Sequence, residues 1–344
     1  MKRYIKLILV IMFMGLSFVQ LKALSNKPQD PNPYFVIKVK DKYGYIDKTG
    51  KVVIKPQFDE AWRFFEGRAR VKIGGKCGYI DKTGKVVINP QFDEAWVFSE
   101  GLARVRIGDW ETGQWGYIDT IGKYVIEPQF NYADDFSEGL ASIEIEDQWG
   151  YIDKSGKVII KPQYDYASSF SEGLAKVQIG DKYGYIDTTG KVVIEPQFDD
   201  AEDFSEGLAK VRIGDWKTGK WGYINKMGEI VINPQFDEVD DFSEGLARIY
   251  DLLTRKYGYI DKTGMIVINP QFDDASYFSE GLAKVKIGDS ETGKWGYIDT
   301  TGNVVIKLQF DGADIFSEGR ARVEIGDKWG YIDKTGKYIW KPTK

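Results

Sequence analysis

Trp115-Gly116-Tyr117-Ile118-Asp119 is one of nine copies of a motif in which Gly-Tyr-Ile-Asp, with one Asn variant, follows a residue that is usually aromatic. Successive copies lie 34, 38, 34, 34, 38, 36, 38 and 34 residues apart. Such a period is the signature of a repeat architecture, and it outweighs the two domains that a length of 344 residues would suggest. The copies begin at Tyr43, Cys77, Trp115, Trp149, Tyr183, Trp221, Tyr257, Trp295 and Trp329.

Each unit contains three segments with the features of β-strands. In Leu102–Ile107, small or apolar residues alternate with arginines, which is typical of a strand with one buried face. The motif is the second strand, and a turn such as Asp47-Lys-Thr-Gly50 leads into a β-branched third strand at 52–54. We expect Pro56 and its counterparts to end the third strand. A connection anchored by buried aromatics such as Phe98 then leads to the next unit.

The units must share a core, because one unit buries too little apolar surface to offset the entropy of ordering it. The first unit opens with a strand at Phe35–Val39, so the first and last units are complete and neither lends a strand to the other. Nine units also exceed the about four to eight blades of usual propellers. The sequence therefore predicts an all-β array of nine three-stranded antiparallel meander repeats over residues 34–344. An open, solenoid-like superhelix is favoured, with a closed β-propeller as the alternative.

The first 25 residues have the features of a secretory signal peptide. Lys2, Arg3 and Lys6 precede an uncharged, mostly apolar run from Leu7 to Val19, and Ala23-Leu-Ser25 suits signal peptidase. The run is too short to cross a bilayer, so we expect cleavage before Asn26 and a periplasmic, cell-surface or secreted protein without a transmembrane span. A Pro-rich leader, residues 26–33, follows. Cleavage removes four cations and no acid, so the formal net charge falls from -5 to -9, which argues against nucleic acid as a partner.

The motif resembles that of the WG-repeat, or KWG-repeat, family of bacterial repeat proteins. The resemblance covers essentially the whole mature chain and implies a binding role without catalytic residues to carry over. It departs from the pattern at Cys77, Asn131, Asn225 and Leu308. The residues that carry it are Lys220-Trp221-Gly222, Lys294-Trp295-Gly296, Lys328-Trp329-Gly330 and the variant Gln114-Trp115-Gly116-Tyr117-Ile118-Asp119.

The residue types predict no catalytic site, no cofactor and no metal. The chain has no His, which removes the usual general base and most zinc sites. Cys77 takes an aromatic position and is interpreted as a core residue. Turn residues such as Asp47, Asp81 and Asp119 are interpreted as caps of their own turns. Glu66, Glu100, Glu138 and Glu172, in corners that usually read Ser-Glu-Gly, are expected to accept hydrogen bonds from backbone N–H groups of the corner.

Two sets of residues are candidates for ligand binding. The first is a row of cations at one position of the first strand, interrupted by Ser142, which would form a basic ladder for a polyanion unless the cations pair with acids of a neighbouring unit. The second is Trp110 and Trp216, in hairpins lengthened by insertions, which either contact a peptide or sugar or fold back onto the sheet. The cations are Arg70, Arg104, Lys176, Lys210, Arg248, Lys284 and Arg322.

The sequence therefore favours a non-enzymatic, exported scaffold that binds a protein or an envelope component through an extended repetitive face. Binding of a polyanion or acidic glycan along the basic ladder is the alternative. A hydrolase built on a pair of acids is a third and less favoured reading, because the acids are copies of turn residues and no pair is unique.

Overall fold

The computed structural model describes residues 33–343, which contain 35 β-strands in nine antiparallel sheets. The predicted signal peptide and most of the Pro-rich leader lie outside the described residues. No helix among residues 33–343 is long and apolar enough to cross a membrane. We number the sheets as blades 1 to 9 in chain order.

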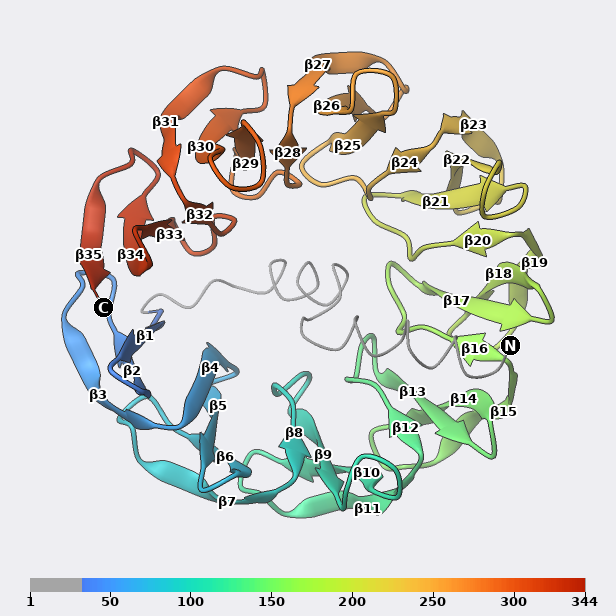
Figure 1. Cartoon of the computed structure of the whole chain (residues 1–344). Helices are drawn as coiled ribbons and strands as arrows, with labels where there is room; N and C mark the ends of the chain where they lie inside the picture. Colours follow the sequence, from blue (N-terminus) through green and yellow to red (C-terminus); the bar gives the residue numbers. More distant parts are fainter. Residues whose placement is uncertain (1–32, 344) are drawn as a thin grey trace. The chain divides into compact units, whose positions relative to one another are not determined.

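Eight blades have four strands and blade 1 has three, and the strands of each blade are adjacent in sequence. The innermost strand, shown nearest the middle of the ring in Figure 1, is short except in blade 2. The inner strands of blades 2 to 9 are β4 (Glu60–Phe65), β8 (Glu94–Ala95), β12 (Tyr132–Ala133), β16 (Tyr166–Ala167), β20 (Asp200–Ala201), β24 (Glu238–Val239), β28 (Asp274–Ala275) and β32 (Gly312–Ala313). The second strands of blades 1 to 9 are β1 (Phe35–Val39), β5 (Arg68–Ile73), β9 (Leu102–Ile107), β13 (Leu140–Ile145), β17 (Leu174–Ile179), β21 (Leu208–Ile213), β25 (Leu246–Asp251), β29 (Leu282–Ile287) and β33 (Arg320–Ile325).

The repeated motif forms the third strand, and the β-branched segment forms the outer strand. The third strands are β2 (Lys42–Ile46), β6 (Lys76–Ile80), β10 (Gln114–Asp119), β14 (Gln148–Asp153), β18 (Lys182–Asp187), β22 (Lys220–Asn225), β26 (Lys256–Asp261), β30 (Lys294–Asp299) and β34 (Lys328–Asp333). The outer strands are β3 (Val52–Phe58), β7 (Val86–Phe92), β11 (Tyr124–Phe130), β15 (Val158–Tyr164), β19 (Val192–Phe198), β23 (Ile230–Phe236), β27 (Ile266–Phe272), β31 (Val304–Phe310) and β35 (Tyr338–Thr343).

Two local predictions about the connection were wrong. The outer strand does not end at Pro56 but continues to Phe58, because a proline on an edge strand removes no ladder hydrogen bond. The connection that follows is not only a loop, since two of its residues pair with the second strand of the next blade, as Ala95 does with Val105. Each of blades 2 to 9 therefore takes its inner strand from the connection, and these units have four strands rather than three. The aromatic anchor Phe98 is buried, as predicted.

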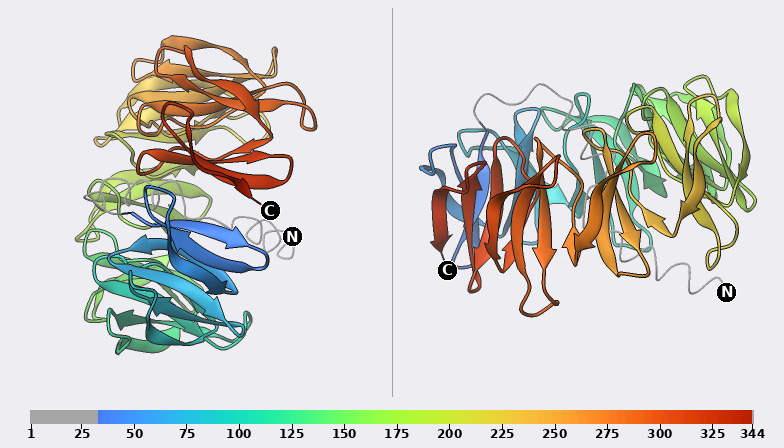
Figure 2. Two further views of the ribbon diagram at one scale, coloured as in Figure 1. Left: turned by 90° about the vertical axis from the view of Figure 1, so that its left-hand side faces the viewer. Right: turned by 90° about the horizontal axis from the view of Figure 1, so that it is seen from above.

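The open superhelix was also wrong, because the nine blades form a closed ring, a nine-bladed β-propeller (Figure 1). Seen from above, the strands of neighbouring blades stand side by side with hairpins at both edges of the ring (Figure 2). In every blade the second strand runs toward the same edge. The hairpins between the second and third strands therefore lie on one face, which we call the hairpin face. The Asp-Lys-Thr-Gly turns and the Ser-Glu-Gly corners lie on the other, which we call the corner face.

The junction that closes the ring, between blades 9 and 1, has the same hydrogen bond as all the other junctions between neighbouring blades. The hydroxyl of the motif tyrosine donates to a backbone carbonyl of the next blade, as Tyr79 does to Trp96 and Tyr117 to Asp134. The ninth copy, Tyr331, donates to the carbonyl of Val36 in blade 1 at 2.8 Å. The guanidinium of Arg320 donates to the Lys48 carbonyl across the same junction. Side chains thus close the ring without exchange of a strand, which is the possibility that the sequence argument left out.

A further contact explains the glycine of the motif. At Gly184 an added Cβ would lie 2.5 Å from the carbonyl oxygen of Ile194, because the outer strand bulges over the glycine. Replacing Gly184 with alanine is therefore expected to lower the free energy of unfolding by about 1–3 kcal/mol, measured by urea denaturation. Gly207→Asn is the matched control. Nothing lies within 4 Å of a Cβ at Gly207, and asparagine tolerates its positive φ of 84°. Equal losses in the two variants would contradict the steric explanation.

Candidate functional site

The cations of the second strands lie between the blades rather than on an open face. Arg104 is only 3% exposed and Lys176 is also buried, whereas Arg322 in the last blade is exposed. The side chain of such a cation reaches a backbone carbonyl in the inner strand of the next blade. Lys176 Nζ, for example, donates to the carbonyl of Ala201 at 2.7 Å. The same contact is made by Arg70, Arg104, Lys210, Arg248 and Lys284. These cations therefore join neighbouring blades in addition to any other role.

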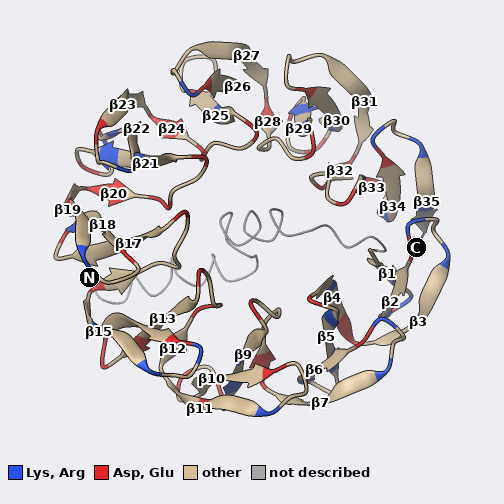
Figure 3. Cartoon of the chain, turned by 180° about the vertical axis from the view of Figure 1, so that it is seen from behind, with Lys and Arg blue, Asp and Glu red and all other residues tan. Residues whose placement is uncertain are grey.

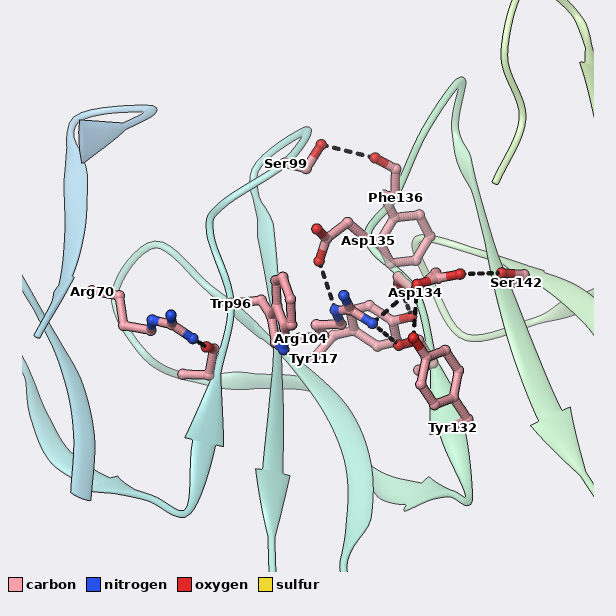
Figure 4. A network of polar contacts seen from close by, with 12 residues as sticks. Arg70, Trp96, Ser99, Arg104, Tyr117, Tyr132, Asp134, Asp135, Phe136 and Ser142 are labelled. Carbon is pink, nitrogen blue, oxygen red and sulfur yellow. Dashed lines mark hydrogen bonds and ion pairs between the residues drawn. The ribbon is translucent and has the colours of Figure 1, made fainter. Parts of the chain in front are cut away.

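Arg104 shows how the charge of such a cation is compensated (Figure 4). Its guanidinium lies 3.0 Å from an Asp134 carboxylate oxygen and 2.9 Å from one of Asp135, and it stacks on the ring of Trp96. Burial alone would lower the pKa of Arg104, but the two carboxylates outweigh it, so the net direction is upward. At the equivalent place in the next blade, Ser142 donates to Asp134 instead. The sequence left open whether these cations pair with acids of a neighbouring unit. At this junction they do.

Other members of the row have a similar environment. Lys176 Nζ is 3.2 Å from Glu202 of the next blade, while Arg248 and Arg322 pair with Asp240 and Asp314 of their own blades. The Lys284 ammonium lies 4.5 Å from the ring centre of Trp295, a distance typical of a cation–π interaction. The structure thus brings most of these side chains into contacts within the ring.

Sequence reasoning missed a set of acids beside these cations. Asp135, Asp203 and Asp241 occupy the same place in three blades, directly before the buried phenylalanine of the connection. Burial raises the pKa of all three carboxyls, and for Asp241 it raises the pKa to about 7 even though Lys210 acts in the opposite direction. The sequence did contain a signal for these acids. The two residues before the phenylalanine differ between units, for example Asp134-Asp135 against Trp96-Val97, whereas the residues around them repeat.

The turn aspartates have the capping role predicted for them. Asp119 Oδ1 accepts hydrogen bonds from the backbone N–H groups of Ile121 at 3.0 Å and Lys123 at 2.9 Å. Asp47 and Asp81 do the same in their own turns. Gly50, the fourth residue of the first such turn, has the expected left-handed φ of 84°. These aspartates therefore stabilise the turns on the corner face.

The corner glutamates bind backbone N–H groups, but those of the following blade rather than of their own corner. Glu66 accepts from Glu100 and Gly101 at 2.9 and 2.8 Å. Glu100, Glu138 and Glu172 make the same kind of contact with the next corner. Each holds a positive φ, 55° at Glu100, which is a costly conformation for a residue with a side chain. This contact between blades gives a physical reason for keeping glutamate in every corner.

The hairpin face carries the aromatic candidates. Trp110 is 58% exposed and Trp216 is 76% exposed, so neither folds back onto its sheet. Each has a cation near its ring: Arg106 at 4.8 Å from the Trp110 centre and Lys217 at 5.0 Å from that of Trp216. Leu253, in the hairpin of blade 7 next to that of Trp216, is 96% exposed but was not among the residues predicted from the sequence. The signal was the replacement of Asp215-Trp-Lys by Asp251-Leu-Leu.

The acids and the single cysteine do not form a metal site in the described part of the chain. Among residues 33–343, no three Asp, Glu or Cys side chains lie close enough together to hold a metal ion. Cys77 is buried, and burial raises the pKa of its thiol. Its interpretation as a core residue is confirmed by its place among Tyr79, Phe92 and Phe98.

The geometry defines the protein as a closed nine-bladed propeller with an aromatic-bearing hairpin face. The chain belongs to the family described as WG containing repeat, whose model matches residues 43–77, 78–109, 115–149, 149–183, 183–215, 221–250, 257–290 and 295–329. No curated protein is similar enough to match.

Solved structures are similar in fold alone. A eukaryotic initiation factor has a TM-score of 0.66 at 12% identity, with 91% of this chain and 96% of that chain covered. A structure from a study of two prolyl endopeptidases has a TM-score of 0.47 at 11% identity, with 97% of this chain and 53% of that chain covered. Hsv2p of Kluyveromyces lactis has a TM-score of 0.43 at 10% identity, with 71% of this chain and 94% of that chain covered.

Proposed function

We propose that this propeller is an exported, non-enzymatic scaffold that binds a protein or a cell-envelope component through its hairpin face. The observation that carries the proposal is the exposure of Trp110 and Trp216 at the same position of equivalent hairpins in blades 3 and 6. A tryptophan buries about 150–250 Å² on contact, and tryptophan is enriched among the residues that dominate binding energy.

The hairpins are held in shape before a partner arrives. Asp109 Oδ1 accepts hydrogen bonds from the backbone N–H groups of Glu111 at 2.9 Å and Thr112 at 2.8 Å. Asp215 does the same for Lys217 and Thr218. Asp93, in the connection before the hairpin, also accepts a hydrogen bond from the Gly108 N–H at 3.0 Å. Binding therefore costs little ordering of the loops, which favours affinity.

Export rests on the N-terminal residues, where cations precede an apolar run and a cleavage motif. Residues 26–344 are the mature chain in this proposal. Expression of the full chain in a bacterium, followed by mass spectrometry of the periplasmic fraction, tests it. An N-terminus at Asn26 is expected, and an uncleaved chain confined to the cytoplasm would contradict export.

Changing Trp110 and Trp216 together to alanine is expected to weaken partner capture at least about tenfold, since truncating a dominant interface residue costs about 2 kcal/mol. The measurement is capture by residues 26–344 from envelope extract and from panels of acidic and neutral glycans, at low and high salt. The matched control is Ile121→Ala with Met227→Ala, which removes exposed apolar side chains from the corner face. Capture that is unaffected by the tryptophan changes but disappears at high salt would favour the polyanion alternative instead.

A further inference from the structure

Blade 1 differs from the other eight blades at the inner edge of its sheet. Its strand nearest the middle of the ring is β1, and no strand among residues 33–343 pairs with the inner edge of β1 (Figure 1). In blades 2 to 9 this edge of the second strand pairs with the inner strand, as Val105 does with Ala95. Several inner strands begin with an acid, for example β20, β24 and β28, which carry red segments in Figure 3. We call the corresponding place beside β1 the inner position of blade 1.

Arg322 of blade 9 is the first of three cations whose counterparts contact the inner strand or the connection. Six other cations of the row donate to a backbone carbonyl in the inner strand of the next blade, as Lys176 does to Ala201 at 2.7 Å. Blade 1 follows blade 9 in the ring, so Arg322 makes no such hydrogen bond within residues 33–343. Its side chain is 45% exposed and pairs with Asp314 of its own blade. Arg322 is therefore able to bind a carbonyl at the inner position of blade 1.

Lys328, the first residue of the third strand in blade 9, is the second cation. The equivalent lysines of blades 1, 2, 5, 6, 7 and 8 each pair with an aspartate of the connection to the next blade, as Lys182 does with Asp199 at 2.7 Å. Lys328 holds the same register position but pairs with no acid in the described part of the chain. It is thus available for an aspartate at the inner position of blade 1.

The third cation is Lys38 in β1. Its counterpart Arg212 in β21 pairs with Asp200 of the inner strand at 3.1 Å. Lys38 is exposed and lies 5.3 Å from the ring centre of Tyr43, and no acid of residues 33–343 pairs with it. Three cations around one place therefore lack, within the described residues, the acceptors that their counterparts bind in other blades.

The backbone of β1 offers matching acceptors. In blade 3 the connection donates backbone N–H groups to the carbonyls of Arg104 and Arg106, both at 3.0 Å. Val36 and Lys38 hold the same register positions in β1. The Val36 carbonyl accepts the hydroxyl of Tyr331, and its second lone pair can accept an incoming N–H. Tyr331 is partly exposed whereas the other eight motif tyrosines are buried, so this junction is less covered than the others.

We propose that the inner position of blade 1 binds an extended acidic peptide of a partner protein as an added strand. The other blades define the sequence that fits: an aspartate, a second acid and a small residue, as in Asp93-Glu94-Ala95. The aspartate pairs with Lys328 and the second acid with Lys38. The carbonyl of the small residue accepts a hydrogen bond from Arg322. In such strand addition the backbone hydrogen bonds supply affinity and the side chains supply specificity.

The sequence that precedes β1 does not contain this pattern. When Val36 is aligned with Arg104, Ser25-Asn26-Lys27-Pro28 take the places of Asp93-Glu94-Ala95-Trp96. These four residues include no acid, and the proline has no N–H to donate to the Val36 carbonyl. We therefore assign the added strand to a partner rather than to the residues before β1.

The test uses residues 26–344 and a fluorescent peptide with the sequence of residues 91–97, blocked at both ends. Fluorescence anisotropy from about 1 to 500 µM protein is expected to show saturable binding. Lys328→Glu is expected to weaken binding at least about tenfold, because the aspartate of the peptide then faces a like charge. The matched control is Lys337→Glu, which makes the same change of charge at an exposed turn position of blade 9 and is expected to leave binding unchanged.

Two altered peptides test the charge pair and the backbone pairing separately. The peptide with Asp93→Lys is expected to bind the Lys328→Glu variant more tightly than it binds the wild type, which also shows that the variant is folded. The peptide with Trp96→Pro lacks the N–H that the Val36 carbonyl accepts, and it is expected to bind the wild type at least about tenfold more weakly.

Absence of saturable binding to the wild-type chain over the whole range would overturn the proposal. So would equal binding of a peptide with the same residues in scrambled order, since net charge alone would then account for it. The variant with Trp110→Ala and Trp216→Ala is expected to bind the peptide as the wild type does. Failure of this proposal and failure of binding at the hairpin face are therefore distinguishable.

Discussion

Replacing Arg104 with methionine is expected to lower the free energy of unfolding by about 3–5 kcal/mol, because the change leaves Asp135 buried without its cation. Methionine fills much of the space of the arginine stem, so lost packing accounts for little of the effect. Urea denaturation followed by tryptophan fluorescence measures it. Adding Asp135→Asn is expected to recover part of the loss, since the buried charge is then removed as well.

The matched control for this prediction is Arg322→Met. Arg322 occupies the same repeat position in blade 9, but its side chain is exposed and makes an ion pair with Asp314 in its own blade. Exposed ion pairs contribute about 0–1 kcal/mol, so this variant is expected to stay close to the wild type. A similar loss in both variants would show that burial of Arg104 does not decide its contribution.

Replacing Asp241 with asparagine is expected to stabilise the protein at pH 8 but not at pH 4. Burial raises the pKa of Asp241 to about 7, and Glu202, Asp240 and Asp203 add to the effect while Lys210 opposes it. Between pH 4 and 7 the unfolded chain releases this proton while the folded chain keeps it, so wild-type stability falls as pH rises through this window. At about 1.4 kcal/mol per pKa unit, the difference from the variant reaches at most about 4 kcal/mol.

The measurement is urea unfolding of both proteins between pH 4 and 8, and the control has the opposite sign. A hydrogen bond from Thr301 lowers the pKa of Asp299, so Asp299 stabilises the fold at neutral pH and loses that contribution in acid. Asp299→Asn is therefore expected to differ from the wild type most at neutral pH, with the wild type the more stable. A difference for Asp241→Asn that does not change with pH would refute the buried titration.

Most of the local structure could be predicted, because it depends on patterns within about six residues. The alternation of Leu102–Ile107 gave strand β9 with the predicted bounds, and the turn beginning at Asp119 closes as expected. The two-residue inner strands could not be predicted in the same way. Glu94 and Ala95 pair only because the connection lies against the next second strand, and two residues are too short to show an alternation.

Closure of the ring and burial of the cations depend instead on contacts between blades. Whether nine equal rotations complete a turn is set by the angle between neighbouring blades, and no residue pattern within a unit encodes that angle. The contact that joins the ends, from Tyr331 to Val36, spans 295 residues. The alternation correctly placed Arg104 on the face of its sheet that the apolar residues do not occupy. That face packs against the next blade rather than contacting solvent.

The sequence by itself determined the repeat, the family, the strands and the turns, since each follows from the period and chemistry of a short segment. Only the tertiary structure decided that the array closes, that cations such as Arg104 lie between blades, and that Trp110 and Trp216 remain exposed on one face. The physical reason is that exposure and charge pairing depend on which surfaces neighbouring blades cover, and that is settled by packing across the ring.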